Sequence, residues 1–227
     1  MKKTTIAMAL LIATSALSGC NETQTTSNTK APTLLPDHEN RLNIYKTVKL
    51  TADLSHLTPD QHKMLGLLIE ASDIMDDLFW QQAFGTNKDA YLASIQNAKV
   101  RKFTEINYGP WDRLNGDKPF LTNVEAKSHG AQFYPSDMTK AEFEASDFAD
   151  KDGLYSMVRR DNDGKLTSIP YSTFFADDLK KAAKLLTKAA SLAEDKSFSE
   201  YLKLRAAALL TDDYQVSDYA WMDMKSN

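Results

Sequence analysis

Apolar residues recur at helical spacing in the segment that follows Thr58-Pro59-Asp60-Gln61. Threonine before the first helical position, proline at that position and glutamine three residues after the threonine form a typical helix start with a capping box. The positions that follow repeat at helical spacing: Leu65, Leu68, Ser72, Met75 and Phe79. The pattern predicts a helix from this start to about Gly85.

A second helical pattern begins after Ser172, which we expect to cap the helix. Its apolar positions step by three and four: Phe175, Leu179, Ala182, Leu186, Ala189 and Ala193. Ser197-Phe198-Ser199-Glu200 then resembles the capping box of a further helix that ends near Leu210. The interruption at 194–196 is short, so the two helices are expected to be antiparallel neighbours. A last segment, 212–224, is rich in aromatic residues and methionine.

The remaining segments predict a mainly α fold of the α+β class. β-favouring stretches around Asp161-Asn162-Asp163-Gly164 predict a β-hairpin near 154–171, and the alternation at 44–54 predicts a short extended segment. One or two short helices are expected over 87–107, an ordered irregular stretch over 108–137, and another short helix over 138–148.

The N-terminus has the pattern of an export signal. Lys2 and Lys3 precede an apolar stretch, Ile6–Ala16, that is too short to span a bilayer as a permanent helix. Leu17-Ser18-Gly19-Cys20 then resembles the lipobox of bacterial lipoproteins. That resemblance implies removal of residues 1–19 as a signal peptide, lipidation of Cys20 and a membrane contact through its lipid. Asn21 is not the aspartate that marks inner-membrane retention in such proteins, which favours the outer membrane, with the protein facing the periplasm or the cell surface.

Composition separates a tether from a folded body. Residues 20–40 are polar and proline-containing, which predicts a flexible tether, and residues 41–227 read as one helical domain. The net charge of −4 gives no electrostatic reason to expect nucleic acid as a partner.

Few residues have a pattern that indicates chemistry. The chain has 1 cysteine and 4 histidines, and no histidine pair has metal-ligand spacing, so no metal ligand and no catalytic residue is predicted. The pairs Asp73/Asp77 and Asp212/Asp218 could bind a divalent cation, but solvated faces and ion pairs are the favoured interpretation. The aromatic block Asn107-Tyr108-Gly109-Pro110-Trp111-Asp112-Arg113 could line a pocket or form a corner of the core. We therefore keep Tyr108, Trp111, Asp112 and Arg113 as candidate pocket-lining residues.

Several blocks of the sequence resemble bacterial proteins related to the dipeptidyl peptidase III family of zinc metallopeptidases. The blocks are 107–114, 133–139, 158–171 and 212–223, and the resemblance runs from about Asn43 to the end. It implies a two-lobed, mostly helical enzyme that removes dipeptides from the N-termini of peptides. In that family zinc is held by a His-Glu-x-x-x-His helix and a more distant glutamate, and this chain contains no such motif.

The resemblance leads to the expectation that residues 41–227 are the N-terminal part of such an enzyme. We expect this part to lack the zinc motif, to bind no zinc cofactor and to be inactive alone, whereas the complete enzyme would act on peptides. The alternative is a complete, non-catalytic lipoprotein that binds a peptide or protein partner. A metal-dependent enzyme built on the two aspartate pairs is a third interpretation.

Overall fold

The computed structural model of this chain describes residues 30–225. The predicted signal peptide of residues 1–19 and the predicted lipidation site, Cys20, lie outside the described residues. Most of the described chain is helical, and its strands form two small antiparallel sheets of two strands each. This agrees with the mainly α class expected from the sequence.

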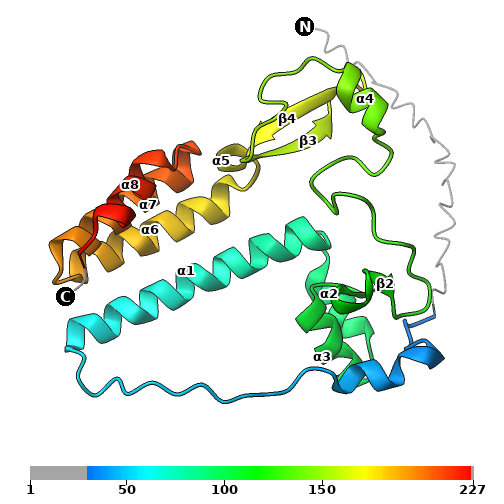
Figure 1. The fold of residues 1–227 in the computed structure, drawn as a ribbon, viewed down its shortest axis with the longest axis horizontal. Helices are drawn as coiled ribbons and strands as arrows, with labels where there is room; N and C mark the ends of the chain where they lie inside the picture. Colours follow the sequence, from blue (N-terminus) through cyan, green and yellow to red (C-terminus); the bar gives the residue numbers. More distant parts are fainter. Residues whose placement is uncertain (1–29, 226–227) are drawn as a thin grey trace, which may run out of the picture. The chain divides into compact units, whose positions relative to one another are not determined.

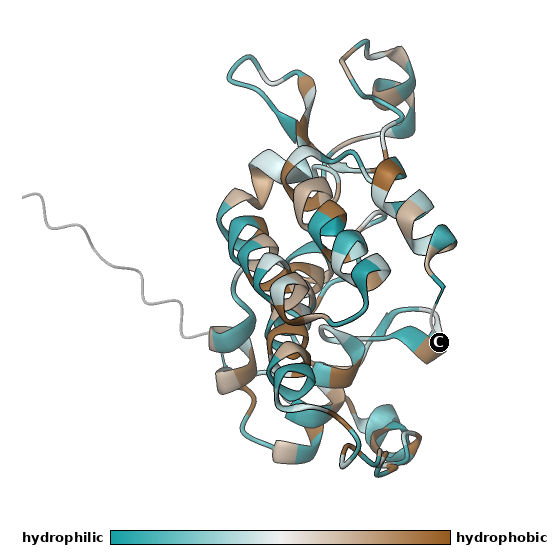
Figure 2. Cartoon of the chain, turned by 90° about the vertical axis from the view of Figure 1, so that its left-hand side faces the viewer, coloured by the Kyte–Doolittle hydropathy of each residue, from teal (hydrophilic) through white to brown (hydrophobic). Residues whose placement is uncertain are grey.

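Three long helices form the centre of the fold: α1 (Pro59–Ala83), α6 (Ala176–Leu192) and α7 (Lys196–Thr211). Helix α6 packs against both α1 and α7 (Figure 1). Brown, hydrophobic stretches lie where these helices run against one another (Figure 2). The apolar face of α6 therefore has two partners within this chain. Helix α1, which comes far earlier in the sequence, covers the side of α6 that α7 does not cover.

The core of this region joins elements from distant parts of the sequence. It includes Leu78 of α1, Met157 of the hairpin, Phe175 and Leu179 at the start of α6, and Leu209 of α7. Burial of such side chains stabilises a fold by roughly 1.5–3 kcal/mol each relative to their exposure. This cluster is therefore what fixes the three helices and the hairpin together.

The helix starts agree only partly with the sequence prediction. The capping box at Thr58 and Gln61 is present as expected. Ser172, in contrast, lies within the short helix α5 (Tyr171–Phe174), and α6 begins after Phe175 without a side-chain cap. Asp195, rather than Ser197, caps α7 by accepting a hydrogen bond from the backbone N–H of Phe198.

A second core lies under shorter elements: η1 (Pro36–Asn43), α2 (Lys88–Ser94), α3 (Ala98–Asn107), β1 (Trp111–Asp112), η2 (Arg113–Asn115) and β2 (Lys118–Pro119). The largest fully buried side chains in it are those of Ile95, Phe120 and Leu121. The N-terminal segment enters this core, because Leu34 bridges Leu121 and the 3₁₀ helix η1 follows at once. Within the segment predicted as a tether, residues 33–35 hydrogen-bond to residues 120–122, and η1 follows them.

The hairpin lies where the sequence places it. Strands β3 (Ser156–Arg160) and β4 (Leu166–Pro170) pair antiparallel. The helix expected over 138–148 is shorter, α4 (Lys140–Ala145), and α8 (Gln215–Asp223) follows α7. Residues 46–54, most of the expected extended segment, form neither helix nor strand and run as an elongated connection to α1 (Figure 1). No helix in the described residues is long and apolar enough to cross a membrane.

Candidate functional site

The block at 107–113 forms a tight corner after α3. Tyr108 ends the helix in the left-handed conformation, and Gly109 follows with a φ of 138°. A side chain on Gly109 would lie 3.0 Å from the Trp111 ring, so both the backbone conformation and the space require glycine here. Asn107 is buried and its side-chain oxygen accepts the backbone N–H of Arg113, which closes the corner.

Asp112 is fully buried and its carboxylate is occupied by groups of the protein. One oxygen accepts Arg41 Nε at 2.7 Å, and the other accepts the backbone N–H of Leu114 at 3.1 Å. The hydrogen bond to Asp112 raises the pKa of Arg41. This pair fastens η1 to β1 across a large sequence separation, so Asp112 is engaged as an anchor of the second core.

The other three candidates lie around the end of α1. The Tyr108 hydroxyl donates to Asp76, and its ring packs edge-on against Phe79 at 4.6 Å. The guanidinium of Arg113 lies over both of these rings, at 5.8 Å from Phe79 and 5.9 Å from Tyr108. The Trp111 indole N–H donates to the carbonyl of Glu125 at 2.9 Å.

One of the four candidates borders a hollow of about 430 Å³ between α1, α2 and α3. Tyr108 lines it together with Asp76, Trp80 and Lys88. The Lys88 ammonium pairs with Asp77 and lies 5.5 Å from the Trp80 ring, so the charges nearest this hollow already have partners. That the four residues line a common ligand pocket stays a prediction.

Three of the four aspartates considered for metal binding, Asp77, Asp212 and Asp218, have other partners. Asp77 pairs with Lys88, and Asp218 pairs with Arg205 at 2.6 Å. Both oxygens of Asp212 accept the backbone N–H of Ser172, at 3.1 and 3.0 Å. In the part of the chain that the structure describes, no three side chains of His, Cys, Asp or Glu come together as metal ligands. The described residues therefore do not fit a zinc centre.

The contact between Asp212 and Ser172 belongs to a junction that sequence reasoning missed. Tyr155, at the start of the hairpin, packs against Tyr214 with ring centroids 4.6 Å apart, and its carbonyl accepts the N–H of Tyr171. Burial raises the pKa of both Tyr171 and Tyr214. The only local signal is an aspartate, Asp212, in the left-handed conformation at the end of α7. This signal does not identify the partner, because Ser172 is 40 residues away in the sequence.

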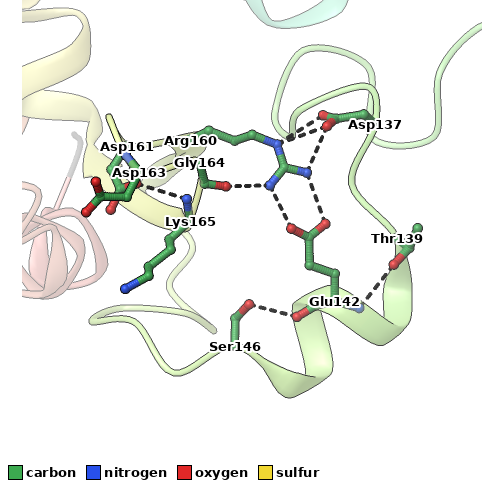
Figure 3. Close-up of polar contacts among 9 residues, drawn as sticks. All are labelled: Asp137, Thr139, Glu142, Ser146, Arg160, Asp161, Asp163, Gly164 and Lys165. Atoms are coloured by element: carbon green, nitrogen blue, oxygen red, sulfur yellow. Dashed lines mark hydrogen bonds and ion pairs between the residues drawn. The ribbon is translucent and has the colours of Figure 1, made fainter.

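Arg160 of the hairpin holds α4 through two carboxylates (Figure 3). Its guanidinium contacts both oxygens of Glu142, at 2.6 and 3.0 Å, and it donates from Nε to Asp137 at 3.0 Å. A further N–H donates to the Gly164 carbonyl at the hairpin turn. These hydrogen bonds hold the pKa values of Asp137 and Glu142 below their usual range. Bidentate arginine–carboxylate contacts fix orientation as well as distance, so Arg160 sets the position of α4.

Three sets of contacts act as anchors between elements of the described chain. Arg41–Asp112, Asp212–Ser172 and the Arg160 network each join elements that are distant in sequence.

Comparisons with known proteins indicate which fold these anchors maintain. No protein-family model matches the sequence. A curated plant relative, Nudix hydrolase 3 of Arabidopsis thaliana, is 30% identical over an alignment of 262 residues that covers 88% of this chain and 33% of the plant protein.

Two solved structures resemble the fold of this chain, and they are more informative than the sequence match to the plant protein. Dipeptidyl peptidase III from Caldithrix abyssi superposes with a TM-score of 0.77 and 36% identity, over 83% of this chain and 38% of the other. Dipeptidyl peptidase III from Corallococcus sp. strain EGB gives a TM-score of 0.75 and 32% identity, over 82% of this chain and 37% of the other. The chain spans about a third of the length of each of these proteins. The described residues therefore have a dipeptidyl peptidase III-like fold.

Proposed function

We propose that this chain is a scaffold portion of a dipeptidyl peptidase III-like, zinc-dependent peptide hydrolase. The observation that carries the proposal is the shared fold with the Caldithrix abyssi enzyme over 83% of this chain at 36% identity. Agreement of sequence and backbone over so long a stretch supports a common ancestor, whereas fold alone would not indicate activity.

The catalytic step would then depend on residues outside this chain. In the resembled family, zinc supplies a Lewis acid and an activated water for peptide hydrolysis. The described residues hold no fitting ligand set. Their role is to keep the helices and the hairpin of the lobe in fixed positions, which a peptidase needs because small displacements of positioned groups reduce catalysis steeply.

The name of the plant relative, Nudix hydrolase 3, describes a different activity. We base the proposal on the two peptidase structures because they match in three dimensions and at higher identity.

The proposal also includes the location of the protein. The lipobox-like Leu17-Ser18-Gly19-Cys20 supports lipidation at Cys20 and anchoring in a bacterial membrane, with the outer membrane favoured by Asn21. An anchored peptidase of this kind would meet peptides in the periplasm or at the cell surface.

A chimera tests the proposed function. Residues 31–225 replace the segment of Caldithrix abyssi dipeptidyl peptidase III on which they superpose, and release of N-terminal dipeptides from a chromogenic amide is measured. The expected result is a folded, zinc-loaded chimera with measurable turnover. The same chimera with Arg160→Met is the control for the scaffold role and should lose most of that turnover while retaining zinc.

A folded, zinc-loaded chimera without turnover would argue against the proposal and favour a lipoprotein that only binds a partner. The isolated chain provides the second measurement: after dialysis it should contain far less than one zinc per chain and release no dipeptide. Stoichiometric zinc with dipeptidyl peptidase activity in the isolated chain would refute the assignment of catalysis to other residues.

A further inference from the structure

The largest of the hollows described here lies away from the block at 107–113, in the irregular segment before and along α4. Its volume is about 620 Å³, within the range of 300–1,000 Å³ that is usual for small-molecule sites. Its lining residues all lie within 126–143.

The lining of the hollow contains basic side chains and no carboxylate side chain. Lys127, His129 and Lys140 line the hollow, and no aspartate or glutamate does. Acidic side chains do lie nearby, but Asp137 and Glu142 both turn to the guanidinium of Arg160 (Figure 3). The hollow therefore presents basic side chains. Asp137 and Glu142 pair with Arg160, whereas Asp117 and Glu144 pair with Lys127 and Lys140 of the lining.

The basic groups can still bind a ligand. Lys140 lies 3.6 Å from Glu144 with 89% of its side chain exposed, and such exposed pairs are weak enough to exchange partners. Lys127 contacts a single oxygen of Asp117 and lies over the Trp111 ring, so its ammonium is held in place with N–H donors to spare.

Aromatic and apolar side chains form the rest of the lining. Tyr134 and Phe143 contact each other edge to face, with ring centroids 6.3 Å apart, and Met138 and Pro135 line the hollow beside them. Ser128 and Ser136 add hydroxyl groups to the lining. Together these groups suit a ligand with an apolar body and one anionic end.

The turn at 128–133 holds the hollow in shape. Gly130 and Ala131 are consecutive left-handed residues, with φ of 75° and 47°. The Tyr134 ring occupies the space where a side chain on Gly130 would lie. Thr139 caps α4, and Arg160 fixes the helix from the other side. The site is therefore organised before any ligand arrives, which reduces the entropy cost of binding.

We propose that the hollow at 126–143 binds a carboxylate attached to an aromatic or apolar body, with Lys127, His129 and Lys140 at the carboxylate and Tyr134 and Phe143 at the apolar part. The C-terminal residue of a peptide and a free aromatic acid share this chemistry. The proposal is independent of the proposed peptidase function, because it uses none of the residues that a zinc centre would need.

Titration of the full-length protein with matched probes tests this site. N-acetyl-phenylalanine carries the carboxylate, N-acetyl-phenylalaninamide has the same body without the charge, and 3-phenylpropionate represents a free acid. The methyl resonance of Met138, recorded by NMR, reports on the hollow. The acid should shift this resonance at concentrations at least tenfold lower than the amide does. Tighter binding of N-acetyl-phenylalanine than of 3-phenylpropionate would identify a peptide C-terminus, and the reverse order a free acid.

Three variants make the test specific. The double variant His129→Gln/Lys140→Gln should weaken binding of the acid at least tenfold and leave the amide unchanged. Ser136→Phe should fill the hollow and abolish the shift with every probe. Lys184→Gln, an exposed lysine on α6, is the matched control and should bind as the unmodified protein does. Equal binding of acid and amide, unchanged binding in the double variant, or no shift with any probe at millimolar concentration would each overturn the proposal.

Discussion

The side chain of Leu179 provides a direct test of the helical core. It lies on α6 and is 4% exposed, in one cluster with Leu78 of α1, Met157 of β3 and Leu209 of α7. Replacement by alanine removes the branched side chain and leaves the helix intact, because alanine has the highest helix propensity. The variant Leu179→Ala therefore reports on the packing of α6 against its partners and on little else.

The expected loss of stability follows from this burial. Leucine-to-alanine changes in packed cores cost about 2–5 kcal/mol, which includes the cavity that remains. Against a total stability of about 5–15 kcal/mol, this is a large fraction. For a chain of this size, about 1 kcal/mol corresponds to about 2–4 °C in melting temperature, so a cost of about 3 kcal/mol lowers it by about 6–12 °C.

Thermal unfolding of the full-length protein, followed by circular dichroism at 222 nm, measures this shift. Leu154→Ala is the control, because Leu154 is 79% exposed and its removal should change stability by no more than about 0.5 kcal/mol. Equal melting temperatures for the two variants would refute the reasoning, since they would mean that α1 and α7 do not bury Leu179 in solution.

Three further predictions concern the anchors and the N-terminus. Arg160→Met should lower stability at neutral pH but not in acid. The pKa values of Asp137 and Glu142 are lower in the folded than in the unfolded state. The stabilisation by Arg160 is therefore complete above the pKa values of the unfolded state and is lost as the pH falls through those of the folded state. Denaturant unfolding at several pH values measures this, with Lys165→Met as the control; parallel pH profiles for both variants would contradict it. Asp112→Asn should lower the melting temperature more than Asp117→Asn, because Asp112 is fully buried with Arg41, whereas Asp117 is half-exposed. Cys20→Ser should move the protein from the membrane to the periplasmic fraction, and retention of this variant in the membrane would exclude lipid anchoring at that residue.

Local signals in the sequence were sufficient for much of the fold. The capping box at Thr58 and the apolar repeat after it determined α1, and the turn at Asp161–Gly164 with its flanking β-favouring residues determined the hairpin. These features depend on hydrogen bonds and side-chain periodicity within a few residues, so they can be read without knowledge of the rest of the chain. The resemblance in the blocks from 107 onward gave the dipeptidyl peptidase III-like fold, which the solved structures support.

The contacts between distant residues were decided only by the tertiary structure. The sequence did not indicate that Asp112 meets Arg41, that Asp212 rather than a local group accepts the N–H of Ser172, or that α1 covers α6. Charge and burial make many such pairings possible, and the packing of the whole chain selects one of them. The same reason explains residues 46–54: alternation predicts an extended backbone, but a strand also needs a partner strand, and none of the described residues provides one.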